Sequence, residues 1–275
     1  MLPERLGEDA VAPLDTVALD SGLAGGLPRG QVSEVVGPAS SGRTSVAWAA
    51  LAAATRRGES VALIDTFDRF DPPTAHACGI DLSRLLWVRG QAVSKTSGAI
   101  DPAWLPGVRA VNLGSPSRVL GAMGLNGPGT FVERVIDRAF KSLNLVVQSG
   151  VCTLVVMDLI DVPANALRRL PASTWFRVER AMEGSDTAVL VLAAMPVARS
   201  AGGRSIVMSA GSREPGTGNR KDVAAPGARL PVPVWKGAHD RTRRIAGVHA
   251  RANITAARSA HSHRVDVKTT VVNAV

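Results

Sequence analysis

The feature that most constrains the fold is a glycine-bounded loop between an apolar strand pattern, Gln31–Val36, and an Ala-rich helix pattern, Ser45–Arg57. The loop reads Gly37-Pro38-Ala39-Ser40-Ser41-Gly42-Arg43-Thr44, with Ser45 next in the chain. In the pattern G-x-x-x-x-G-K-[ST], the glycines let backbone N–H groups face the phosphates, and the hydroxyl residue binds Mg²⁺. This context predicts a nucleotide-binding loop over Gly37–Ser45. A turn that binds no ligand is the alternative interpretation.

Arg43 stands where the pattern has Lys. A planar guanidinium keeps the charge of an ammonium group but is bulkier, so the two are not interchangeable in a tight phosphate cradle. We therefore expect nucleotide binding to survive this change better than phosphate transfer does.

Strand and helix patterns alternate along the rest of the chain. Continuous apolar runs predict buried strands at Val61–Asp65, Leu85–Val88, Val151–Asp158 and Ala188–Ala194, and helical patterns cover Thr74–Cys78, Phe131–Ser149 and Ser173–Met182. His249–Ala257 and Arg264–Val272 alternate as antiparallel strands do. The fold class predicted is α/β: a mostly parallel, twisted sheet flanked by helices, with an antiparallel C-terminal edge. Asp158 ends one of these strands.

The predicted organisation is a single domain over residues 1–275. It comprises a short N-terminal lead at 1–13, a loop-rich insertion at 91–130 and a mobile basic loop at 199–235. No apolar run approaches the ~18 residues of a membrane helix, and no secretory signal is visible. Cys78 and Cys152 lack metal-type spacing. A cytoplasmic protein without a membrane partner is expected.

Charge is segregated along the chain, whose net charge is +9. Residues 199–275 hold 14 Lys and Arg against four Asp and Glu, a net charge of +10. Such a region favours a polyanionic partner, and a solvated loop without a ligand is the alternative. A second cluster, Arg241, Arg243 and Arg244, fits DNA or an acidic protein equally well.

Several motifs together resemble the bacterial RecA recombinases, closely over residues 14–88 and again from about Phe131. Besides the loop, they are Gly25-Gly26-Leu27-Pro28-Arg29-Gly30-Gln31, the block Ile64–Pro72 followed by Gly79-Ile80-Asp81, and Leu154-Val155-Val156-Met157-Asp158. The resemblance implies a RecA-like core that binds ATP or ADP with Mg²⁺, and it makes Thr44 and Asp158 the expected metal site. It also implies that the loop following Ala188–Ala194 faces single-stranded DNA, so the residues predicted to contact DNA are Arg199, Arg204, Arg213, Arg220 and Lys221.

The departures from this family concern catalysis and assembly. Phe67 stands where the family has the glutamate that activates water, and Met195 matches its γ-phosphate-sensing Gln; a one-residue shift of the alignment is the alternative at either position. We expect the chain to lack the family's N-terminal docking arm and its C-terminal domain. We therefore expect little or no ATP hydrolysis, and a monomer or hetero-complex instead of a self-filament.

A shortened, catalytically altered RecA-like chain is similar to the ImuA group of damage-tolerance accessory proteins. That resemblance implies a role in the SOS response and translesion synthesis, near the bacterial nucleoid. The implied partners are RecA or a polymerase-associated protein, with weak binding to single-stranded DNA. The alternative is a DNA-dependent ATPase that acts on single-stranded DNA in homologous recombination.

Overall fold

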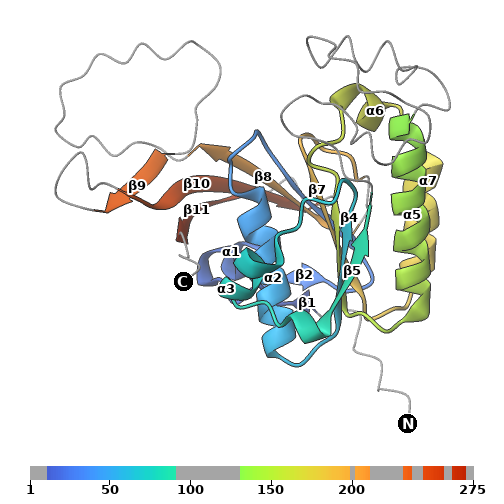
Figure 1. The fold of residues 1–275 in the computed structure, drawn as a ribbon, viewed down its shortest axis with the longest axis horizontal. Helices are drawn as coiled ribbons and strands as arrows, with labels where there is room; N and C mark the ends of the chain where they lie inside the picture. The colour runs from blue at the N-terminus through green and yellow to red at the C-terminus, as the bar shows by residue number, and fades with distance from the viewer. Residues whose placement is uncertain are drawn as a thin grey trace, which may run out of the picture.

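The computed structural model describes residues 11–90, 131–198, 202–210, 232–236, 244–256 and 262–270. Its centre is a nine-stranded sheet in the order β11-β10-β8-β3-β7-β6-β4-β5, with β9 paired to β10 (Figure 1). The strands are β3 (Val32–Val36), β4 (Val61–Asp65), β5 (Leu85–Arg89), β6 (Leu154–Asp158), β7 (Ala188–Ala193), β8 (Arg204–Ala210), β9 (Val232–Lys236), β10 (Arg244–Ala256) and β11 (Ser262–Thr270). Strands β3 to β7 pair in parallel, and β8 joins β3 in parallel.

Helices cover both faces of the parallel part of the sheet (Figure 1). On one face lie α1 (Val17–Gly22), α2 (Arg43–Arg56) and α3 (Pro72–Ala77); on the other lie α5 (Phe131–Ser149) and α7 (Ala172–Met182). The remaining elements are the β1 (Val11–Ala12) and β2 (Leu27–Pro28) pair, η1 (Leu82–Arg84) and α6 (Ala164–Arg168).

Strands β4, β6 and β7 are apolar up to their last residues, because successive side chains enter two different cores. In β4, Ala62 and Ile64 pack on the α5 side, whereas Val61 and Leu63 pack on the α2 side. The predicted stripe of α5 is buried at Val135, Ile136, Ala139, Leu143 and Val147. Phe140 on α5 meets Trp175 on α7 edge to face, with ring centroids 5.0 Å apart.

The predicted fold class is confirmed, including the antiparallel edge. Strand β10 pairs antiparallel with both β8 and β11. The prediction of a loop throughout 199–235 is wrong for Arg204–Ala210, which form β8, and for residues 232–235, which belong to β9. Strand β8 was missed because it lies in a segment rich in Gly, Ser and Arg, although its buried Ile206 and Met208 alternate with the more exposed Ser205, Val207 and Ser209.

The insertion predicted at 91–130 lies outside the described residues, and so does most of the N-terminal lead. None of the helices in the described ranges combines the length and the apolar character needed to cross a membrane.

Candidate nucleotide site

The predicted phosphate loop joins the C-terminal end of β3 to the N-terminus of α2. Three of its residues have positive φ: Gly37 (+155°), Ser40 (+59°) and Gly42 (+94°), the last being the N-cap of the helix. A Cβ on Gly37 would lie 2.5 Å from the carbonyl oxygen of Met208, so the loop packs directly on β8. Glycine is therefore required at this contact by space as well as by conformation.

The loop suits a phosphate group. Pro38, Ala39 and Ser40 are exposed, and they precede a 14-residue helix whose N-terminus carries free N–H groups and a partial positive charge. Ser41 is fully buried, and its Oγ lacks a hydrogen-bond partner within the described residues. A turn that carries an orphaned hydroxyl and a helix N-terminus fits an anion better than it fits a purely structural role.

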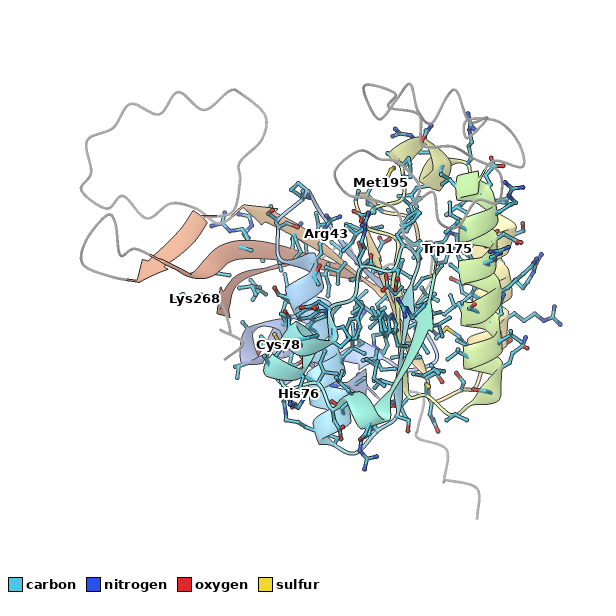
Figure 2. All side chains as sticks on the ribbon, in the orientation of Figure 1. Arg43, His76, Cys78, Trp175, Met195 and Lys268 are labelled. Atoms are coloured by element: carbon cyan, nitrogen blue, oxygen red, sulfur yellow. The ribbon has the colours of Figure 1, made fainter. Side chains whose placement is uncertain are left out.

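Arg43 spans from this loop to the end of β7. Its Nη1 donates a hydrogen bond to the carbonyl oxygen of Ala193 at 2.8 Å, and only 7% of the residue is exposed. Burial lowers the pKa of the guanidinium, and the nearby carboxylates of Asp158 and Asp161 oppose that shift. Figure 2 shows Arg43 at the same end of the sheet as Met195. Arg43 thus connects α2 to β7. This role differs from that of the motif's lysine, which extends along the phosphates.

A cavity of about 200 Å³ lies beside the first turns of α2. It brings together the two predicted metal ligands, Thr44 and Asp158, with Asp65, Arg69 and Asp161. Asp65 and Asp158 face each other in register at the ends of the neighbouring strands β4 and β6. Burial, and then the charges of Asp65 and Asp161, raise the pKa of Asp158 to about 6. A hydroxyl beside a crowded carboxylate suits Mg²⁺, because a cation would offset this repulsion.

Phe67 points away from the cavity. It is 6% exposed and belongs to the core on the α5 side of the sheet, while the cavity opens on the α2 side. Asp68 offers no substitute, since its two oxygens accept hydrogen bonds from Nε and Nη2 of Arg89 at 2.9 and 2.7 Å. Asp65 accepts backbone N–H groups from Arg69 and Phe70. The carboxylates that follow or end β4 are thus committed to structural bonds.

The segment after β7 carries an apolar side chain, Met195, which packs against the α5-side core. Beyond it, the backbone N–H groups of Val197 and Ala198 donate to Oε2 of Glu34 at 2.8 and 2.9 Å. Oε1 of Glu34 accepts from Ser205 Oγ at 2.8 Å. This buried carboxylate on β3 therefore holds the start of the segment that leads toward β8.

Of the five residues predicted to bind DNA, the structure describes only Arg204. Arg204 begins β8, where its backbone N–H donates to Ser33 Oγ. Arg199, Arg213, Arg220 and Lys221 lie outside the described residues.

Two features of the site were not predicted. Arg69 forms an ion pair with Asp161 at the cavity wall, and Glu34 accepts hydrogen bonds from the segment after β7. The role of Glu34 could have been predicted from the sequence, because it is the only charge in an apolar strand pattern and a buried charge requires hydrogen-bond partners. The sequence contains no comparable sign of the Arg69 ion pair, because its partner lies 92 residues away.

Comparison with known proteins agrees with this geometry. The RecA N-terminal domain family matches residues 6–162. Protein RecA of Brucella anthropi is 31% identical over 186 residues, covering 62% of this chain and 51% of the relative. Protein RecA of Treponema denticola is 28% identical over 180 residues, covering 62% of this chain and 42% of the relative. The chloroplastic DNA repair protein recA homolog 1 of Arabidopsis thaliana is 31% identical over 170 residues, covering 57% of this chain and 38% of the relative.

The chain spans about half the length of these curated relatives, or somewhat less. The family match covers more than half of this chain and includes the phosphate loop, Phe67 and Asp158. The chain therefore belongs to the RecA N-terminal domain family.

Proposed function

We propose that this chain is a RecA-like nucleotide-binding accessory protein in DNA repair and damage tolerance, with ATP hydrolysis weak or lost. It holds ATP or ADP with Mg²⁺ at Gly37–Ser45, and it acts by binding single-stranded DNA and a RecA or polymerase-associated partner. The names of the relatives, RecA and a DNA repair protein, support the link to DNA repair.

The observation that carries the proposal is the position of Phe67. It occupies the family's glutamate position, yet it is packed in the core on the far side of the sheet from the cavity. Loss of a general base typically costs about 10²- to 10⁴-fold in rate. The loop, its glycines and the Thr44–Asp158 pair remain suited to holding a nucleotide. Binding without appreciable turnover follows from this combination.

Calorimetry with MgADP and MgATP tests binding, and phosphate release with single-stranded DNA present tests turnover. The wild-type protein should bind both nucleotides and release phosphate no faster than a blank. Gly42→Asp should abolish binding, because it strains a positive-φ residue and places a carboxylate among the phosphates. Rapid, DNA-stimulated ATP turnover would overturn the proposal.

Gly58→Asp provides the matched control, since Gly58 also has positive φ (+84°) and lies just beyond the opposite end of α2. It should bind nucleotide as the wild-type protein does. Equal loss in both variants would attribute the effect to a damaged helix. Filaments formed with ATP on single-stranded DNA, observed by electron microscopy, would favour a recombinase instead.

The DNA-binding part of the proposal rests on the +10 charge of residues 199–275. We expect the affinity for a single-stranded oligonucleotide to fall with salt by about 0.7 log units per phosphate contact per decade. Replacing Arg213, Arg220 and Lys221 with Ser should weaken binding and flatten this slope. Replacing the exposed Arg168, Arg169 and Arg177 with Ser removes the same charge elsewhere and should change little. A flat salt response of the wild-type protein would contradict DNA binding.

The partner is tested with purified proteins. Surface-immobilised chain should capture RecA or a polymerase-associated protein from the same organism. If capture of the partner requires nucleotide, partner binding depends on the phosphate loop Gly37–Ser45. Failure of both to bind, with and without DNA, would contradict the accessory role.

A further inference from the structure

An arginine outside the phosphate-loop motif lines the cavity beside the loop. Arg69 follows β4, and among the described residues that form the cavity wall it is the only cation. The Nε of Arg69 donates to Oδ2 of Asp161 at 2.9 Å, and the Arg69 side chain retains 21% exposure. Arg43, by contrast, is committed to the carbonyl oxygen of Ala193 and is absent from this wall.

The backbone holds Arg69 in place. Its N–H donates to Asp65 Oδ1 at 2.7 Å. On one side, Asp68 has positive φ (+55°) and is clamped by Arg89. On the other side, the Phe70 ring packs edge to face between Trp48 and Trp87, with centroid distances of 6.3 and 5.2 Å. The backbone of Arg69 is therefore held by its neighbours, and the ion pair with Asp161 holds the guanidinium at the cavity wall.

The charge of the cavity wall also needs a cation. Asp65, Asp158 and Asp161 line it, and their mutual repulsion contributes to the raised pKa of Asp158. Nucleotide phosphates held by the loop would meet these carboxylates. If Thr44 and Asp158 hold the Mg²⁺ of the nucleotide, the phosphates would lie beside this wall. Arg69 is then the nearest protein cation on the wall that can neutralise the added charge.

We propose that Arg69 binds the terminal phosphate of ATP, exchanging Asp161 for the phosphate, and so makes the site prefer a nucleoside triphosphate over a diphosphate. This inference rests on the proposed nucleotide site and adds selectivity to it. Asp161 holds the guanidinium of Arg69 while the terminal phosphate is absent. When ATP binds, Asp161 competes with the phosphate for the guanidinium. The pair provides a phosphate contact where Met195 and Phe67 offer no polar group.

The test is the ratio of ATP to ADP affinity, measured by calorimetry with Mg²⁺ on the full chain. A hydrogen bond between charged groups is worth about 10- to 100-fold in affinity. Arg69→Gln should therefore weaken ATP binding about 10-fold or more and leave ADP binding nearly unchanged. Asp161→Asn should shift the ratio in the opposite direction, because it frees Arg69 and removes a competing charge. Arg69→Lys should restore part of the preference.

Arg56→Gln is the matched control, since Arg56 also forms a 2.9 Å ion pair, with Asp15, in the last turn of α2, away from the cavity. It should leave the ratio unchanged. Equal weakening of ATP and ADP in Arg69→Gln, or no shift in Asp161→Asn, would overturn the role of Arg69 while leaving the nucleotide site in place. Absence of binding in the wild-type protein would overturn the proposed function itself.

Discussion

Arg43 and Ala193 join the phosphate loop to the strand that ends beside it. The guanidinium Nη1 lies 2.8 Å from the Ala193 carbonyl oxygen, although 150 residues separate the two in sequence. The residue at the lysine position is thus a structural link between the first turn of α2 and the end of β7.

Replacing Arg43 should reveal the contribution of this link to stability. Arg43→Met keeps much of the side-chain length but removes the donor, leaving the buried carbonyl oxygen of Ala193 without this bond. We expect the free energy of unfolding to fall by about 1 to 3 kcal/mol, as measured by urea denaturation. Arg177→Met on the exposed face of α7 should change it by less than about 0.5 kcal/mol. Equal values for the two variants would show that the bond contributes nothing in solution.

Phe67 is expected to act as a core residue. Phe67→Ala opens a cavity on the α5 side and should cost about 3 to 5 kcal/mol in unfolding free energy. Nucleotide affinity should be unchanged at temperatures where the variant is folded, since the side chain lies across the sheet from the nucleotide cavity. Phe176→Ala, where the ring is 59% exposed, should cost less than about 1 kcal/mol. A selective loss of nucleotide binding in Phe67→Ala would contradict this assignment.

The contact between Gly37 and β8 predicts a steric effect. Gly37→Ala would place a methyl group 2.5 Å from the Met208 carbonyl oxygen, so the loop or β8 must shift. Overpacking and strain together should cost about 2 to 4 kcal/mol. Gly150→Ala also places an alanine at positive φ (+64°), but nothing lies within 4 Å of the new Cβ, so about 1 kcal/mol is expected there. Similar thermal shifts for the two variants would exclude a tight contact at Gly37.

The raised pKa of Asp158 predicts how stability depends on pH. The folded carboxyl group titrates at about 6, above its ordinary value of 3.8, so the folded state binds this proton more tightly than the unfolded state does. Stability from this group is therefore greatest at low pH and falls as pH rises from about 4 to 6, by up to about 3 kcal/mol. The cause is burial, strengthened by Asp65 and Asp161.

Denaturation between pH 4 and 7.5 in metal-free buffer measures this effect. Asp158→Asn should flatten the dependence and stabilise the protein at pH 7. The exposed Asp81→Asn serves as the control and should leave the slope of the wild-type protein in place. A wild-type slope that persists in Asp158→Asn would assign the titration to another group.

Local patterns were sufficient for much of the fold. The bounds of β4 and α5 were predicted to the residue, because a continuous apolar run and a helical stripe are properties of adjacent residues. The strand–loop–helix order around Gly37–Thr44 was likewise visible, since glycine spacing and flanking periodicity are local. Strand β8 was missed, because its pairing with β3 and β10 decides its conformation more than its composition does.

The chemistry of the site depended on contacts that no local pattern contains. The partner of Arg43 is on β7, and the partner of Arg69 follows β6. Parallel strands bring their carboxyl ends to one edge of the sheet whatever their separation in sequence, so pairing order determines which side chains meet. Residue types alone indicated a nucleotide loop with altered catalytic positions. The packing of the sheet decided that Phe67 enters a core, that Arg43 spans to β7 and that Arg69 faces the cavity.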